Sequence, residues 1–223
     1  MNSSWSKQVL AVFRKEAKIE LRTLSGITTT GMLCFVSIVV ANSITWTSSI
    51  NPLVAAGLYW MILIFAASVS LTRTFIQEEE AGNSDFWRLT SKPEAVFMGK
   101  ALFNSIQMIV VTTMVSLLFV PLVKVQVANW FLYLGTGMFG SIAIAATATL
   151  AGAISAPSNN RYALAAAVSV PLLVFLANLG VTATATAFGE ALPRGELGGL
   201  AMLCYAIASL SIGPGVYSKI WKG

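Results

Sequence analysis

The sequence predicts an all-α integral membrane protein with six transmembrane helices. Of its 223 residues, 56% are hydrophobic and only 10% are charged, with a mean hydropathy of +0.76. A soluble domain carries about a quarter charged residues. The charged residues are also bunched, so that five long segments contain none: 23–72, 101–123, 125–160, 162–189 and 197–218. These segments lack the two-residue alternation of a membrane β-barrel, which leaves helices as the predicted spanning structure.

The lengths of the uncharged segments set the number of spans. A helix rises about 1.5 Å per residue and the hydrocarbon core is about 30 Å thick, so about 20 residues cross once. The first segment is long enough to cross twice, with a break at Ser48-Ser49-Ile50-Asn51-Pro52. The predicted spans are 27–47, 53–74, 101–122, 130–154, 162–180 and 197–218.

The distribution of Lys and Arg predicts the orientation. With the N-terminus inside, residues 1–27, 73–100, 155–161 and 219–223 share one side and hold 5, 4, 1 and 2 of the 14 basic residues, whereas the opposite side holds Lys124 and Arg194. Basic residues favour the cytoplasmic side. We therefore expect a multi-pass membrane protein with both termini cytoplasmic. The net charge of +5 then reflects topology, and we expect no nucleic-acid partner.

Residues 5–24 form a predicted amphipathic helix that lies in the lipid headgroup layer. On a helical wheel one side is basic and the other is mainly apolar; the basic side consists of Lys7, Arg14, Lys15, Lys18 and Arg22. The stretch lacks the features of a cleavable signal peptide, so we expect it to remain. This divides the chain into a lead-in helix at 1–26 and a six-helix transmembrane domain at 27–223.

Two carboxylates, Glu16 and Glu20, fall on the apolar side of this lead-in helix. A charge in such a place needs a partner. One interpretation is a structural ion pair with a cation such as Arg73 or Arg88. The alternative is that the two carboxylates sense movement of the segment after the second span.

That segment, residues 73–100, is the predicted cytoplasmic coupling segment. It contains an acidic cluster, a helix end at Gly82-Asn83 and a short helix over 85–89 capped by Ser84. Ser91-Lys92-Pro93-Glu94 has the pattern of a capping box, which predicts a further helix that runs into the third span. Phe86 and Trp87 either contact a protein partner or lie flat at the membrane interface.

A second irregular stretch is expected on the outer side. The Thr and Ala alternation over 181–187 is a poor helix former. It is either a short re-entrant segment or an ordinary external loop.

Several kinds of chemistry are missing from the sequence. It has no histidine, no CxxC motif and no phosphate loop, because Gly99-Lys100 is followed by Ala101. Apart from Arg73 at the end of the second one, no charged residue falls within a predicted span, so transport would need energy from another subunit. We expect no catalytic residue, no metal site and no cofactor bound by this chain.

Together these features resemble an ABC-2 type (type V exporter-like) permease, and more narrowly the haem exporter protein B (CcmB) family. The resemblance covers nearly the whole chain, although its motifs are individually short. They are Phe13-Arg14-Lys15-Glu16 with Glu20 and Arg22, Leu58-Tyr59-Trp60 with Phe65-Ala66, Phe75-Ile76-Gln77-Glu78-Glu79, Gly99-Lys100 with Asn104, and Ala156-Pro157-Ser158-Asn159-Asn160 with Ser169-Val170-Pro171.

The resemblance implies the permease subunit of a cytochrome c maturation transporter in a bacterial cytoplasmic (inner) membrane. It implies a separate CcmA-like ATPase that binds ATP, CcmC-like and CcmD-like membrane subunits, and a CcmE-like haem chaperone released when ATP is hydrolysed. Haem is then handled by the complex. The implied contacts with the ATPase are Glu78, Glu79, Glu80, Asp85, Phe86, Trp87, Arg88, Ser158, Asn159 and Asn160.

Two other functions stay open at this point. The same fold serves permeases for lipid, glycan or drug. An integral membrane enzyme would instead need clustered carboxylates or histidines at the membrane face, and only residues 78–85 offer any.

Overall fold

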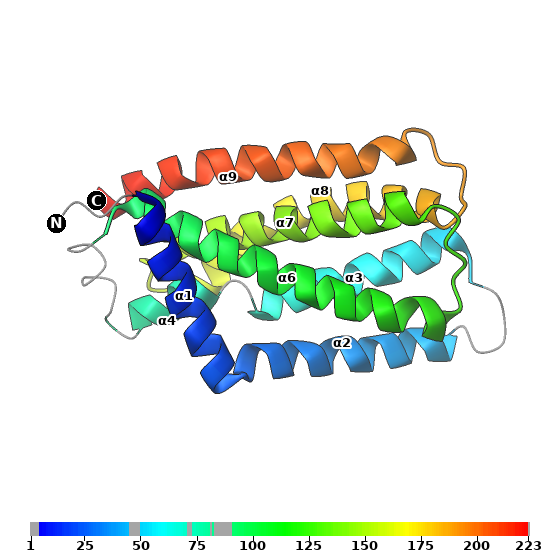
Figure 1. Cartoon of the computed structure of the whole chain (residues 1–223), viewed down its shortest axis with the longest axis horizontal. Helices are drawn as coiled ribbons and strands as arrows, with labels where there is room; N and C mark the ends of the chain where they lie inside the picture. The colour runs from blue at the N-terminus through cyan, green and yellow to red at the C-terminus, as the bar shows by residue number, and fades with distance from the viewer. Residues whose placement is uncertain (1–4, 45–49, 71–72, 81, 83–90, 223) are drawn as a thin grey trace.

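The computed structural model describes residues 5–44, 50–70, 73–80, 82 and 91–222. Six long helices run side by side along the long axis, and a further helix, α1, lies across the end that carries both termini (Figure 1). All six are long and apolar enough to cross a membrane, which confirms the predicted six-span, all-α architecture. The helices of the described chain are α1 (Trp5–Thr23), α2 (Ser25–Ile44), α3 (Pro52–Ser70), α4 (Arg73–Glu80), α6 (Pro93–Val123), α7 (Trp130–Ser155), α8 (Arg161–Ala187), η1 (Gly195–Leu197) and α9 (Gly198–Lys222).

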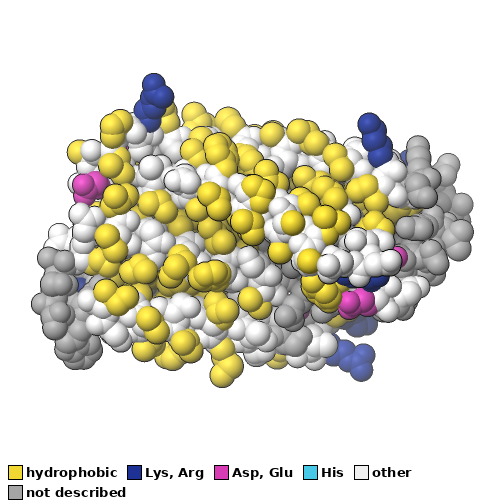
Figure 2. Space-filling view, turned by 180° about the vertical axis from the view of Figure 1, so that it is seen from behind, with side chains coloured by type: hydrophobic (Ala, Val, Ile, Leu, Met, Phe, Trp, Pro, Cys, Tyr) yellow, Lys and Arg dark blue, Asp and Glu magenta, His cyan; other side chains and the backbone are white. Residues whose placement is uncertain are grey.

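The surface agrees with a membrane-spanning protein. On the face in Figure 2, hydrophobic side chains cover the middle, and charged side chains lie toward the two ends. Large apolar side chains remain exposed along the bundle, among them Met32, Leu117 and Phe131. Such exposure is unfavourable in water and is expected where lipid surrounds the helices.

Asparagine side chains begin two of the spans. Asn51 Oδ1 accepts a hydrogen bond from the backbone N–H of Leu53 at 2.8 Å, and Asn129 Oδ1 accepts one from Leu132 at 3.0 Å. Each satisfies a backbone donor that the first turn of a helix leaves unpaired. The predicted break between the first two spans therefore ends in a capped helix start.

The third long helix, α6, starts at Pro93 and continues unbroken through the membrane, as the sequence predicts. The predicted capping box is wrong, however, because the N-cap is Lys92, with no hydrogen bond from its side chain. A residue before proline is held in extended backbone, and proline favours the first helical position. Lys92, with φ −80° and ψ 137°, meets both conditions. Ser91 therefore lies one residue too early to cap.

Residues 181–187 are helical, so neither predicted alternative, a re-entrant segment or an external loop, is correct. They form the last part of α8. Two threonines satisfy their hydroxyl groups within the helix: Thr182 donates to the carbonyl of Asn178 at 3.0 Å and Thr186 to that of Thr182 at 2.9 Å. The alanines between them are buried against the bundle. Packing therefore outweighs the weak helix preference of threonine.

The core is centred on α7, whose small residues allow α6, α8 and α9 to pack closely around it. Trp60 of α3 is fully buried there. A Cβ added at Gly140 of α7 or at Gly180 of α8 would lie 2.3 or 2.2 Å from its ring atoms. Its indole Nε1 donates to Thr184 Oγ1 at 2.8 Å. One tryptophan thus joins α3, α7 and α8.

Candidate functional site: a buried charge cluster

The candidate site lies where α1 crosses the first turns of α6. Gly99 of α6 faces Val12 of α1, and a Cβ added at Gly99 would lie only 2.6 Å from Val12 Cβ and 2.9 Å from the Val9 carbonyl oxygen. The missing side chain therefore lets the two helix backbones approach closely. The next residue along α6, Lys100, then lies directly beneath α1.

Lys100 is a fully buried cation, with 0% of its surface exposed. Its Nζ lies 2.8 Å from Glu16 Oε1 of α1 and 2.8 Å from Glu78 Oε2 of α4. Three helices therefore meet at one ammonium group, and one of them, α1, is more than 75 residues away from it in the sequence. Because a buried charge is costly unless it is paired and hydrogen-bonded, these contacts make its burial possible.

Lys15 completes the cluster. Its Nζ lies 3.1 Å from Glu16 Oε1 and also pairs with Glu78 Oε1. Lys15, Glu16, Glu78 and Lys100, which we call the charge cluster, contain two positive and two negative groups. The assembly is therefore neutral, as a site largely removed from water requires.

Glu78 and Lys15 are the two charge-cluster residues outside the membrane-spanning helices. The charges around them favour the ionised form of each. Burial opposes ionisation of Glu78, but the positive charges of Lys100 and Lys15 outweigh it and hold the pKa of this carboxyl below its ordinary value. Burial likewise opposes the charge on Lys15, yet Glu16 and Glu78 raise its pKa. Glu78 and Lys15 are therefore both charged at neutral pH.

An aromatic group borders the charge cluster. Lys100 Nζ lies 4.8 Å from the centroid of the Phe75 ring, within the range of a cation–π contact. Phe75 in turn packs against Phe97 and Tyr217, with ring centroids 6.4 and 5.0 Å away. These rings tie α4 to α6 and α9 and keep water from the cation.

Glu20 has a different role from Glu16. Its Oε1 accepts a hydrogen bond from the backbone N–H of Ile27 at 2.8 Å, in the first turn of α2. A carboxylate is favourable at a helix N-terminus, where backbone donors are unpaired. Leu24, at φ +50°, turns the chain between the two helices. Glu20 thus fixes α1 to the start of α2.

Within the described residues, Glu16 of the lead-in helix forms the expected kind of ion pair, with Lys100 and Lys15 as its partners. The cations named from the sequence, Arg73 and Arg88, stay untested as partners. The side chains of both arginines lie outside the described residues. Lys15 was grouped with the basic surface side of α1, but it turns toward Glu78.

Two of the predicted ATPase-contact regions lie close together. Tyr162 at the start of α8 donates from its hydroxyl to Glu80 Oε2 at 3.3 Å. Tyr162 follows the turn that contains Ser158, Asn159 and Asn160, in which Ser158 Oγ accepts from the backbone N–H of Asn160 at 3.2 Å. The end of α4 and this turn thus form one surface at the end with both termini.

The remaining predicted contacts cannot be placed on this surface. Asp85, Phe86, Trp87 and Arg88 lie outside the described residues. Glu79 is partly buried in a small cavity beside Tyr217 and Trp221 of α9, whereas Glu80 is exposed.

Sequence reasoning missed Lys100 as a site residue. It was placed just outside a span predicted to begin at residue 101, whereas it is the eighth residue of α6. The available signal was the glycine before it: a Gly-Lys pair in the second turn of a membrane helix permits close packing and leaves the cation needing a partner.

The chemistry of the site is that of a structural joint. The charge cluster links α1, α4 and α6 through charge-assisted hydrogen bonds, which are stronger than neutral ones. Within the described part of the chain, no group of three or more Cys, Asp or Glu residues is placed to hold a metal ion. What the arrangement can do is hold three helices together.

Comparison with known proteins identifies the family. A comparison with curated proteins returns no match. The family model for the CcmB protein matches residues 7–216, which includes the charge cluster, the first five spans and most of α1 and α9. The chain therefore belongs to the CcmB family and is the multi-pass permease subunit of a haem exporter ABC transporter of cytochrome c biogenesis.

Proposed function

We propose that this permease receives the movement of its ATPase partner through α4 and passes it, by way of the charge cluster, to α1 and α6. The observation that carries the proposal is the position of Lys100, which is buried between Glu16 of α1 and Glu78 of α4. A displacement of α4 that leaves these pairs intact must carry both other helices with it.

The contact with the ATPase is proposed for the surface formed by the end of α4 and the turn at 158–160. Glu80 and Tyr162 join these two parts. Asp85, Phe86, Trp87 and Arg88 are proposed to extend this contact from the adjoining segment. The acidic and polar groups here suit a soluble partner, and the chain has no phosphate loop of its own for ATP.

The end that carries both termini is proposed to face the cytoplasm. This places 12 of the 14 basic residues inside, in agreement with the positive-inside rule. In the resulting complex, CcmC-like and CcmD-like subunits lie beside the permease, and ATP hydrolysis releases a haem-loaded CcmE-like chaperone at the outer face.

The decisive experiment compares Glu78→Gln with Glu80→Gln in the chain co-purified with its ATPase subunit. Both changes remove one negative charge from α4, but only Glu78 belongs to the charge cluster, and a glutamine in place of Glu80 can still accept the hydrogen bond from Tyr162. We expect both complexes to assemble, and we expect Glu78→Gln alone to lose the cytochrome c maturation that wild type supports in cells while ATP turnover continues. Equal, full maturation with both variants would refute coupling through the charge cluster.

A second experiment tests the orientation. After Cys34 and Cys204 are replaced by serine, single cysteines are introduced at the exposed positions Asn159 and Ala191. A membrane-impermeant maleimide added to intact spheroplasts should label position 191 and spare position 159. Labelling of position 159 from outside would overturn the proposed topology and, with it, the contact with a cytoplasmic ATPase.

A further inference from the structure

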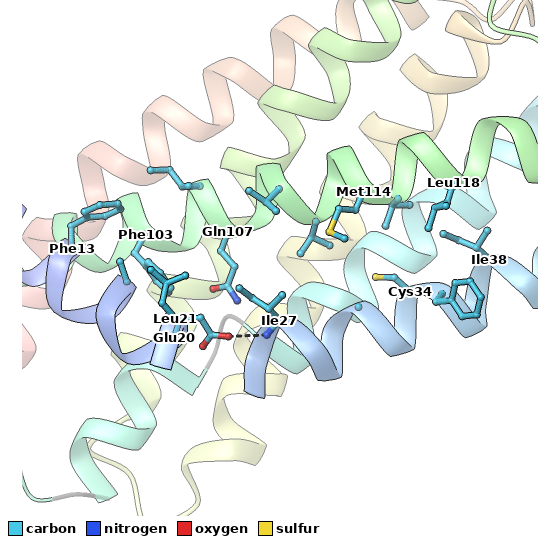
Figure 3. Close-up of a pocket in the computed structure, with 17 residues that line it drawn as sticks. Phe13, Glu20, Leu21, Ile27, Cys34, Ile38, Phe103, Gln107, Met114 and Leu118 are labelled. Carbon is cyan, nitrogen blue, oxygen red and sulfur yellow. Dashed lines mark hydrogen bonds between the residues drawn. The ribbon is translucent and has the colours of Figure 1, made fainter. Parts of the chain in front are cut away.

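A long apolar groove lies between α2 and α6 and ends beneath α1 (Figure 3). Its volume is about 250 Å³, and its lining is almost entirely hydrophobic. In the figure, Phe13 and Leu21 of α1 lie at one end, and Ile38 and Leu118 lie at the other. The groove therefore begins at the helix that crosses the end of the bundle and extends along two spans.

We propose that this groove binds one acyl chain of an anionic phospholipid, whose headgroup rests on the basic side of α1. The ligand is thus a lipid of the leaflet that borders the end carrying both termini. The site is separate from the charge cluster, which uses another side of α1.

The length of the groove fits one leaflet. Along α2 the lining runs from Ile27 to Ile38, and along α6 it runs from Phe103 to Leu118. At about 1.5 Å per residue these stretches measure roughly 16 and 22 Å. One leaflet of the hydrocarbon core is about 15 Å thick. An acyl chain that enters at α1 therefore reaches the bilayer centre within the groove.

The basic residues of α1 at the near end of the groove, which we call its mouth, point to an anionic headgroup. Ala17 and Leu21 line the groove, and Arg14 and Lys18 precede them by three residues each, so each pair lies on neighbouring positions of the helix surface. Arg14 and Lys18 are exposed, and Leu21 is 70% exposed at the rim. The surface of α1 thus changes from apolar to cationic within one turn, which matches an amphiphile with a negative head.

The carboxylate at the mouth does not oppose this arrangement. Glu20 lines the groove, but its Oε1 is held by the backbone N–H of Ile27 (Figure 3). Its charge is directed at the N-terminus of α2, which offsets it. The cations on the other side of α1 therefore face a headgroup without a competing partner from Glu20.

The test uses two photoreactive lipids in the full-length chain, reconstituted in bilayer discs of neutral phosphatidylcholine. Each probe carries a diazirine in the middle of one acyl chain; one is phosphatidylglycerol and the other is phosphatidylcholine. We expect the anionic probe to label the groove peptides of α2 and α6 at least fivefold more than the neutral probe, because each of the two basic side chains contributes about that factor near an anionic group.

Two variants separate the headgroup contact from the chain contact. Arg14→Gln with Lys18→Gln should reduce labelling by phosphatidylglycerol to the level of phosphatidylcholine. Gly31→Phe should reduce labelling by both lipids, because a Cβ there meets nothing within 4 Å and the ring fills the groove. Gly215→Phe is the matched control: it is also an exposed helical glycine with open space, but it lies outside the groove.

Three results would overturn the proposal. One is equal labelling of the wild-type chain by both lipids, a comparison that needs no variant to fold. Another is unchanged groove labelling in Gly31→Phe. A third is no labelling of the groove by either probe, which would show that protein covers it.

Discussion

Gly99 and Val12 meet where α1 crosses α6, at a separation that leaves no room for a side chain on the glycine. An added Cβ would lie 2.6 Å from Val12 Cβ. This contact sets how deeply the lead-in helix sits on the bundle. It therefore also sets whether Glu16 reaches Lys100.

Gly99→Leu is predicted to separate the two helices. Overpacking of a close contact costs about 1–3 kcal/mol, and here it would also stretch the ion pairs to Lys100. Thermal unfolding in detergent should show a lower midpoint, and trypsin should cut faster after the basic residues of α1. Gly57→Leu is the control, since a Cβ at Gly57 meets nothing within 4 Å. Equal melting of the two variants would show that α1 is not held at this point.

Lys100→Met is predicted to destabilise the protein by about 3–5 kcal/mol, because it leaves two buried carboxylates with one cation. Glu16→Gln alone should also destabilise. The double variant should lose less than the sum of the two, with a coupling energy of about 0.5–3 kcal/mol, measured by chemical unfolding in mixed micelles. Additive losses would mean that the 2.8 Å contact contributes nothing to stability.

The charge cluster predicts how stability depends on pH. The pKa of Glu78 is below its ordinary value of 4.5, so its contribution is complete above that pH and is lost as the pH falls through the lowered value. The pKa of Lys15 is above 10.5, so its contribution is complete below that pH and is lost as the pH rises through the raised value. Melting temperatures should be flat between these limits.

Glu78→Gln gives the matched comparison for this pH profile. It should lower the melting temperature at neutral pH and show a smaller further loss in acid than the wild type, because the titrating carboxyl is gone. If the melting temperatures of the two proteins fall equally as the pH is lowered, the sensitivity to acid arises from groups other than Glu78.

Gly180→Ala is predicted to unfold or mispack the core, since the added Cβ would lie 2.2 Å from the Trp60 ring. Trp60→Phe should partly rescue this variant by making room. Rescue is expected to be incomplete, because the ring packing is reduced and Thr184 loses its partner at 2.8 Å. The yield of monodisperse protein on gel filtration reports both effects. Failure of Trp60→Phe to improve that yield would place the cause outside this contact.

The spans could be predicted from the sequence because they depend on a one-dimensional property, the distance between charged residues. The amphipathic helix α1 could also be predicted, because a helical wheel separates its basic residues from its apolar ones. It ends within one residue of the predicted position. The partner of Glu16 could not be predicted from the sequence, since Lys100 lies 84 residues away and comes close only because α1 and α6 pack tightly at Gly99. The end of α8 was missed for a related reason: threonines that look unfavourable locally are stabilised by buried neighbours.

Trp60 has a consequence for how the permease changes shape. Its indole is enclosed by glycines of α7 and α8 while it is anchored on α3. Separating these three helices would expose the indole, which favours their movement as one unit. We expect shape change in this subunit to occur at its periphery instead, where α1 and α4 lie against that centre.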